Sequence, residues 1–123
     1  MTKKITIAID AMGGDNAPFK TIKGVYLFLK NNVSNSDFQL NLYGDQIKLK
    51  EELSKYKISK ENIKIIHAES SISDEETPLT AVKNAKNTSM WNCIKSQADG
   101  EADVSLSAGN TGVLLVISRM ILK

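Results

Sequence analysis

The fold class of this chain is decided by the stretch Ala102-Asp103-Val104-Ser105-Leu106-Ser107-Ala108-Gly109-Asn110-Thr111-Gly112. Residues 102–106 are typical of a short strand, and the apolar residues from Val113 to Leu122 are typical of a helix. A turn of small residues, 107–112, joins the two. Such a turn brings backbone N–H groups and the positive end of the helix close to one point. The stretch therefore predicts a β-α unit whose turn suits an anion such as phosphate.

The turn at 107–112 has two interpretations from its residues alone. It lacks the Gly-Lys-Ser/Thr ending of a P-loop and the Gly-x-Gly-x-x-Gly spacing of the dinucleotide-binding turn. In the first interpretation its hydroxyls, amides and glycines bind an anion, and the residues concerned are Ser107, Gly109, Asn110, Thr111 and Gly112. In the second, Asn110 or Thr111 only caps the helix, because such residues are common at helix starts. Spacing alone leaves both open.

The rest of the chain continues the alternation of strand and helix. We expect strands at 5–9, 38–43 and 63–67, and helices at 18–31, 47–56 and 78–96. Strands that alternate with helices pair in parallel through right-handed crossovers. The sequence therefore predicts one α/β domain over residues 1–123, with three α/β/α layers and a mostly parallel sheet.

Three loops are expected at one edge of that sheet. The loops after the first, third and fourth strands leave the carboxyl ends of their strands, where open α/β sheets bind ligands. These loops are 10–15, 70–77 and 107–112. The helix that follows the second of them carries Lys83, which is close enough to the helix start to reach the ligand edge.

The loop after the first strand is a second candidate for ligand binding. The pair Gly13-Gly14 permits a close backbone approach that a Cβ would forbid. A carboxylate from Asp10 or Asp15 would then orient the ligand or bind a cation. In the alternative, this is a tight turn in which Asp15 or Asn16 caps the next helix. Two such loops on one sheet edge favour a site.

Three other features have side chains that can take part in chemistry, but their sequence context favours a structural role for each. The acidic run Asp74-Glu75-Glu76 lacks the alternating ligands of a calcium loop and complements the positive end of the helix after it, so no metal site is predicted. His67 ends an apolar strand without a partner motif nearby. Cys93 occupies a core-like position within a helix, which favours a buried thiol over a nucleophile.

Composition restricts the class of protein further. A net charge of +2 without a basic stripe gives no indication of a nucleic-acid partner. The single cysteine excludes an internal disulfide and fits a reducing cytoplasm. The longest apolar run, Val113–Ile117, is far shorter than the roughly 20 residues of a membrane span. We therefore expect a cytoplasmic protein, with contact at a membrane surface left open.

Three blocks of the sequence together resemble the bacterial phosphate acyltransferases that start glycerophospholipid synthesis. The first is Ile7-Ala8-Ile9-Asp10-Ala11-Met12-Gly13-Gly14-Asp15 with Ala17-Pro18. The second is Asp74-Glu75 with Pro78, Ala81-Val82-Lys83 and Asn87-Thr88-Ser89-Met90. The third is Gly100-Glu101-Ala102-Asp103 with 107–112. Their order over nearly the whole chain makes the resemblance specific.

The resemblance implies a fold similar to the isopropylmalate dehydrogenase and phosphotransacetylase class, of which this chain is the amino-terminal portion. It implies transfer of a fatty acyl group from acyl carrier protein to inorganic phosphate, giving acyl phosphate for a downstream membrane acyltransferase. It also implies a homodimer at the inner face of the membrane, without a cofactor. The phosphate or acyl phosphate contacts that it implies are Asp10, Gly13, Gly14, Asp15, Lys83, Ser89, Ser107, Gly109, Asn110, Thr111 and Gly112.

Two rival functions remain open. Family members are longer than this chain, so we expect an incomplete, truncated fold with an uncovered apolar helix, little acyltransferase activity alone and a tendency to associate. The first rival is a non-catalytic remnant that binds phosphate, which binding without turnover would favour. The second is a phosphotransacetylase-like enzyme acting on a coenzyme A thioester, which a preference for acetyl-coenzyme A would favour.

Overall fold

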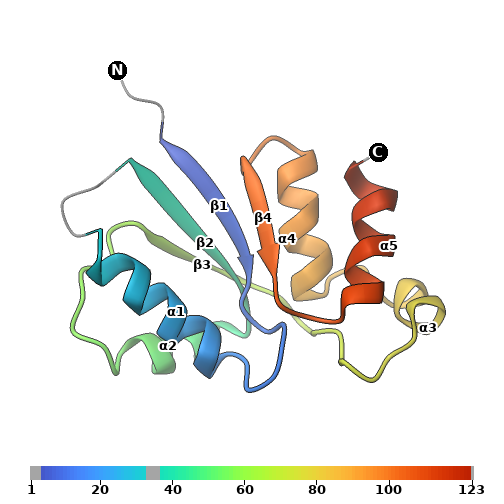
Figure 1. The fold of residues 1–123 in the computed structure, drawn as a ribbon, viewed down its shortest axis with the longest axis horizontal. Coiled ribbons are helices and arrows are strands. Elements are labelled where there is room, and N and C mark those ends of the chain that lie inside the picture. Colours follow the sequence, from blue (N-terminus) through green and yellow to red (C-terminus); the bar gives the residue numbers. More distant parts are fainter. Residues whose placement is uncertain (1–3, 33–36, 123) are drawn as a thin grey trace.

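The computed structural model describes residues 4–32 and 37–122, and its centre is a four-stranded parallel sheet in the order β3-β2-β1-β4 (Figure 1). The strands are β1 (Ile5–Asp10), β2 (Phe38–Gly44), β3 (Ile63–His67) and β4 (Val104–Ser107). The predicted parallel α/β class is confirmed. The fourth strand begins two residues later than the sequence indicates, and the first reaches Asp10.

Within the described ranges, five helices lie on the two faces of the sheet and at one end of it (Figure 1). They are α1 (Phe19–Lys30), α2 (Gln46–Leu53), α3 (Pro78–Lys83), α4 (Ser89–Ala98) and α5 (Thr111–Leu122). Helices α1 and α2 cover one face, α4 packs on the other, and α3 and α5 pack against each other beside α4. This arrangement gives the predicted three layers.

The core is divided between the two faces because strand side chains alternate in direction. Towards α1 and α2, the apolar strand residues are Ile7, Ile9, Phe38, Leu40, Leu42, Ile63 and Ile65. Towards α4, a smaller cluster holds Ala8, Tyr43, Ile66, Cys93 and Ala102. A third cluster joins α3, α4 and α5 through residues that include Ala81, Met90, Ile94, Val113 and Ile117. The burial of Cys93 agrees with its predicted structural role.

The prediction of one helix over 78–96 is wrong, because the chain forms α3 and α4 with a break at 84–88. Asn87 takes a φ of 71°, which no helix residue adopts. Thr88 then starts a new helix, since its side chain accepts the Trp91 amide at 3.2 Å. The break places Ser89 in the first turn of α4 and not in the middle of a long helix.

The start of α4 is fastened to the loop after β3. A parallel bridge joins Ser70 to Thr88, and the Ser89 amide donates to the Ser70 carbonyl at 2.9 Å. Thr77 caps α3 by accepting the Thr80 amide at 3.3 Å, with Pro78 in the first turn. The loop after β3 is therefore held at both ends.

The outer side of α5 has no cover among the described residues. Val113 and Ile117 are fully buried, whereas Leu115 between them is 71% exposed. Leu106, on edge strand β4, is 54% exposed. The expected uncovered apolar surface is present. No helix in the ranges 4–32 and 37–122 has the length and apolar character needed to cross a bilayer.

Candidate functional site

The sheet edge between β1 and β4 is organised around one buried carboxylate, Asp10. This residue ends β1, pairs in register with Ser107 at the end of β4, and is 3% exposed. The Ser89 hydroxyl donates to its Oδ1 at 2.6 Å, and the Ser107 hydroxyl donates to its Oδ2 at 2.8 Å. The Met12 amide also donates to Oδ1, at 3.2 Å. One side chain thus joins the loop after β1, the start of α4 and the end of β4.

The electrostatics of this carboxylate are set by opposing effects. Burial raises the pKa of Asp10 above its ordinary value, while the three hydrogen bonds that it accepts act in the opposite direction. Burial, followed by the charge of Asp10, raises the pKa of the neighbouring Cys93 to about 12. Cys93 therefore stays a neutral thiol at physiological pH. In the part of the chain that the structure describes, no group of three His, Cys, Asp or Glu residues is arranged to hold a metal ion.

The glycine turns after β1 and β4 lie in direct contact. A Cβ added at Gly13 would lie 2.8 Å from both the Asp10 Oδ2 and the Gly109 amide nitrogen. Gly14 has a φ of 90°, and a Cβ there would lie 2.9 Å from the Ala108 carbonyl oxygen. Both positions require glycine, the first for space and the second for conformation as well. The expected close backbone approach is present, and the partner is the second glycine turn.

The start of α5 presents free backbone donors at this edge. The Ser107 Oγ accepts the Gly109 amide at 3.1 Å while its own proton goes to Asp10. The amides of Thr111 and Gly112 hydrogen-bond to none of the residues that the structure describes, and both residues are exposed. The first-turn amides of a helix have no partner within the helix. Two N–H groups and the positive helix end therefore face solvent here.

Asn110 caps α5 and also fastens a second loop to it. Its Oδ1 accepts the Val113 amide at 3.3 Å, so the capping interpretation is confirmed for this residue. Its Nδ2 donates to the Glu76 carbonyl at 2.7 Å and to the Ser73 carbonyl at 3.2 Å. The acidic loop 73–76 is thereby held beside the start of α5.

Sequence comparison identifies the family. A sequence model of the family described as "Fatty acid synthesis protein" matches residues 5–123. The chain belongs to this family. The "Phosphate acyltransferase" of Pelagibacter ubique is 42% identical over the whole chain, which spans 35% of that relative. The "Phosphate acyltransferase" of Streptococcus pneumoniae (strain Hungary19A-6) is 45% identical over 89% of the chain, and the match spans 31% of that relative. The chain thus spans about a third of the length of these curated relatives.

The match confirms the resemblance to the amino-terminal portion of the phosphate acyltransferases. In this family member, the structure brings together most of the residues that the resemblance implies, namely Asp10, Gly13, Gly14, Ser89, Ser107, Gly109, Asn110, Thr111 and Gly112. Two stand apart. Asp15 and Lys83 are exposed, and neither side chain hydrogen-bonds or forms an ion pair with another described residue.

Two features of the site escaped prediction from the sequence. One is the break before α4 that brings Ser89 to Asp10, for which the signal was Asn87-Thr88, a residue that tolerates positive φ followed by a good N-cap. The other is the hydrogen bond that the side-chain amide of Asn110 donates to loop 73–76. No local pattern indicates that contact, because its partners lie more than thirty residues away.

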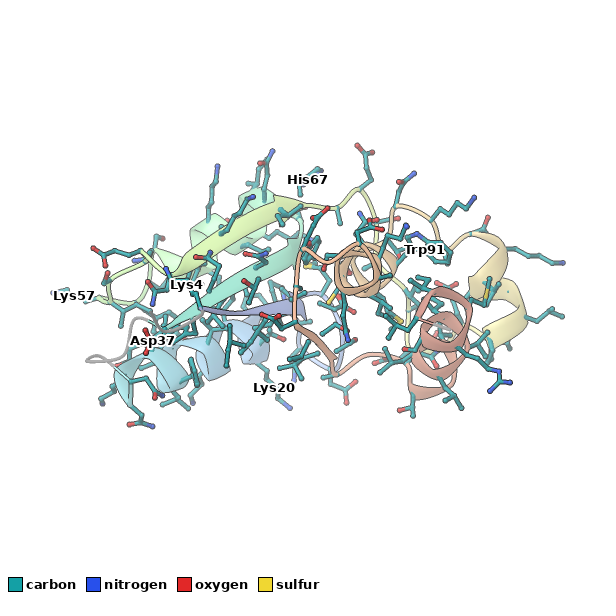
Figure 2. The ribbon with its side chains drawn as sticks, turned by 90° about the horizontal axis from the view of Figure 1, so that it is seen from above. Lys4, Lys20, Asp37, Lys57, His67 and Trp91 are labelled. Carbon is teal, nitrogen blue, oxygen red and sulfur yellow. The ribbon has the colours of Figure 1, made fainter. Side chains whose placement is uncertain are left out.

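His67 has the structural role that the sequence favours. Its Nδ1 accepts the Gln46 amide at 3.2 Å, so it supplements the cap at the start of α2. Figure 2 shows His67 at the end of β3, exposed and on a different element from the labelled Trp91 of α4. The Asp45 side chain accepts the Ile47 and Lys48 amides at the same helix start. His67 is therefore part of a helix start, and the one side-chain hydrogen bond that it forms with the described residues is to the Gln46 amide.

Proposed function

We propose that this chain supplies the phosphate-binding side of a phosphate acyltransferase, which transfers a fatty acyl group from acyl carrier protein to inorganic phosphate. The observation that carries the proposal is the convergence of two glycine turns and the start of α5 on the Asp10–Ser89–Ser107 cluster. Family membership and the names of the relatives support the acyl-transfer chemistry.

The phosphate is assigned to the start of α5. The free amides of Thr111 and Gly112 and the positive helix end suit an anion. Gly13 and Gly14 let the loop after β1 pack directly against the turn that precedes this helix start. Because α3 packs on α5, we assign Lys83 the role of neutralising charge on the bound phosphate. Asp15, exposed on the first loop, is assigned to orientation of the substrate.

The reaction needs few groups from the protein. A phosphate oxygen forms a bond to the thioester carbonyl carbon, the carbon–sulfur bond breaks, and the carrier leaves as a thiol after gaining a proton. Phosphate is already an anionic nucleophile at neutral pH, so its position relative to the thioester and donors to the developing oxyanion are the main requirements. This explains how a site without a Ser-His-Asp triad serves acyl transfer.

The acyl-binding side belongs, in this proposal, to the sequence that the relatives have beyond the matched third. We also assign to the complete enzyme a cytoplasmic location, a homodimeric state and peripheral contact with the membrane that holds the next acyltransferase. The 123-residue chain alone is then expected to bind phosphate with little turnover. Its uncovered Leu106 and Leu115 fit this division, because they offer an apolar surface for the remainder of the fold.

A chimera tests the activity. This chain replaces the matched third of the Pelagibacter ubique relative, and the product is incubated with palmitoyl-acyl carrier protein and inorganic phosphate. Hydroxylamine traps acyl phosphate as a hydroxamate, and we expect hydroxamate that depends on added phosphate. Acetyl-coenzyme A serves as the competing substrate. A chimera that matches the relative in circular dichroism and molecular size, but prefers acetyl-coenzyme A or forms no hydroxamate, would contradict the proposal.

A further inference from the structure

The buried carboxylate of Asp10 is too deep to be a phosphate contact. It is 3% exposed, and its oxygens are occupied by the hydroxyls of Ser89 and Ser107 and by the Met12 amide. An anion would also be repelled by a carboxylate at contact distance. We propose that Asp10 is the positioning residue of the phosphate site, holding the turn 107–112 in its binding geometry through the two serines. This inference rests on the proposed function and assigns the organising role within it.

The first path of this positioning runs through Ser107. Its hydroxyl proton is directed at Asp10 Oδ2, which leaves its oxygen oriented to accept the Gly109 amide at 3.1 Å. That bond fixes the turn two residues before the free amide of Thr111. Loss of the Asp10 acceptor lets the Ser107 hydroxyl rotate, so the Gly109 amide loses its oriented acceptor although it does not touch Asp10.

The second path runs through Ser89 in the first turn of α4. Ser89 is 1% exposed, and its short 2.6 Å bond to Asp10 Oδ1 connects α4 to the end of β1. The Met90 side chain on the same turn packs against Gly109, where an added Cβ would lie 3.0 Å from the Met90 Cε. The start of α4 therefore packs against the glycine turn 107–112, and the hydrogen bond from Ser89 to Asp10 fixes the position of that helix start.

A carboxylate suits this role better than an amide of the same shape. Three donors point at Asp10, and an ionised carboxylate only accepts hydrogen bonds. The substitution Asp10→Asn keeps the volume but turns an N–H group towards one of the serine hydroxyls. That hydroxyl must then redirect its proton. The variant is a sharp probe, because it changes donor direction with little change in packing.

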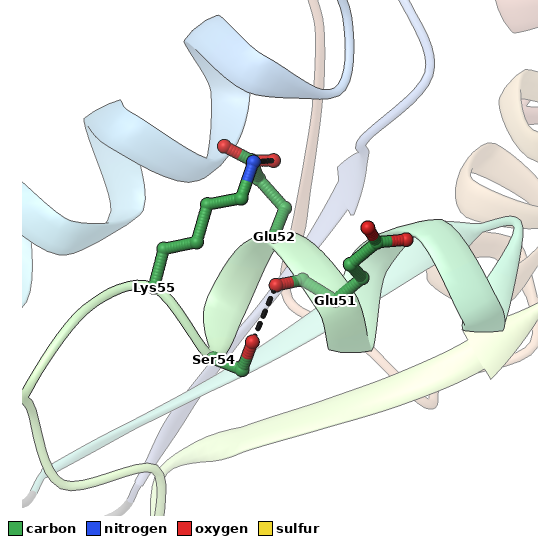
Figure 3. Close-up of polar contacts among 4 residues, drawn as sticks. All are labelled: Glu51, Glu52, Ser54 and Lys55. Carbon is green, nitrogen blue, oxygen red and sulfur yellow. Dashed lines mark hydrogen bonds and ion pairs between the residues drawn. The ribbon is translucent and has the colours of Figure 1, made fainter.

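The chain offers matched controls for both partners. Glu52 is another buried carboxylate, 7% exposed, whose partner is the Lys55 ammonium at 2.8 Å on the far side of the sheet (Figure 3). Ser105 lies on β4 two residues before Ser107 and donates to Gln97 Oε1 at 2.7 Å. Glu52→Gln and Ser105→Ala therefore remove equivalent groups outside the site.

The experiment uses the ¹⁵N-labelled 123-residue protein titrated with inorganic phosphate and followed through the Thr111 and Gly112 amide resonances. Asp10→Asn and Ser107→Ala are expected to weaken phosphate binding at least about tenfold, the factor expected for one hydrogen bond to a charged group. Neither Glu52→Gln nor Ser105→Ala is expected to change the phosphate affinity by more than about twofold. Where Asp10→Asn fails to fold, Ser107→Ala tests the same path with the Asp10–Ser89 bond intact.

A second readout separates positioning from general stability. Hydrogen exchange of the Gly109 amide is compared with that of Leu42, a fully buried residue of β2. We expect Asp10→Asn to accelerate hydrogen exchange of the Gly109 amide more than that of the Leu42 amide, since only the Gly109 amide donates to Ser107 Oγ. Two results would overturn the positioning role alone. One is equal acceleration of exchange at both amides, and the other is a wild type that binds phosphate and an Asp10→Asn variant that binds it equally well. Absence of phosphate binding by the wild type would overturn the proposed function and this inference with it.

Discussion

Replacement of Gly13 by alanine tests the contact between the two glycine turns. The added Cβ would lie 2.8 Å from Asp10 Oδ2, 2.8 Å from the Gly109 nitrogen and 2.9 Å from Ser107 Oγ. Two of these neighbours are hydrogen-bonded to each other, and the third is backbone, so none moves freely. Gly13 is not among the residues with positive φ, and the effect therefore comes from space alone.

The magnitude follows from two contributions. Overpacking a close contact destabilises by about 1–3 kcal/mol. If Ser107 is displaced from Asp10, loss of a hydrogen bond to a charged group contributes about 1.5–3 kcal/mol, which overlaps with the first. We therefore expect Gly13→Ala to lower the free energy of unfolding by about 3 kcal/mol, a large part of the stability of a small domain.

The assay is urea unfolding followed by circular dichroism and by the fluorescence of Trp91, the single tryptophan of the chain, on α4. Gly24→Ala is the control, because Gly24 lies within α1 and a Cβ there meets nothing within 4 Å. That variant should gain about 1 kcal/mol from helix propensity. The test is that Gly13→Ala lowers the free energy of unfolding whereas Gly24→Ala raises it. A Gly13→Ala protein within about 0.5 kcal/mol of wild type would refute the close contact, since changes of that size are ordinary for surface positions.

Three further perturbations address the contact between Asn110 and loop 73–76, the uncovered helix α5 and the buried carboxylate of Asp10. Asn110→Asp keeps the cap of α5 but loses the donor to loop 73–76, so hydrogen exchange in that loop should quicken while α5 stays protected; unchanged loop protection would contradict the contact. Ile117→Ala should cost about 2–5 kcal/mol in urea unfolding, and Leu115→Ala less than about 0.5 kcal/mol, because the first side chain is fully buried and the second is 71% exposed. Burial raises the folded-state pKa of Asp10 above 3.8, so folding takes up a proton, and the stability present below the unfolded pKa is lost as pH rises through the folded one. The unfolding free energy of wild type relative to Asp10→Asn should accordingly fall as pH increases from below 3.8, whereas a pH-independent difference would show that Asp10 does not titrate differently on folding.

The sequence predicts the sheet and its ligand edge because both follow from patterns that are local or topological. Apolar strand residues such as Ile5–Ile9 indicate parallel pairing, and parallel strands place their carboxyl ends together. That reasoning correctly brings Asp10 to Ser107, although they lie 97 residues apart. The close approach of Gly13 to Gly109 follows from the same topology.

The contacts that the sequence does not predict depend on the tertiary structure. The break at 84–88 competes with a helical pattern on both sides, and it is accompanied by a bridge between Ser70 and Thr88 that the sequence pattern does not indicate. The Asn87-Thr88 pair marks the break locally, but the position of Ser89 beside Asp10 also depends on how α4 packs against β1. The two-sided role of Asn110 is hidden for the same reason, since capping is visible locally and its second set of partners is not.

Titration of the ¹⁵N-labelled protein with inorganic phosphate, at constant ionic strength and with chloride as the control anion, tests the proposed site most directly. We expect saturable shifts centred on the Thr111 and Gly112 amides, extending to Gly14 and Gly109 in the adjoining turns. Shifts confined to exposed lysines, or no saturable shift at the start of α5, would contradict a phosphate site at this sheet edge.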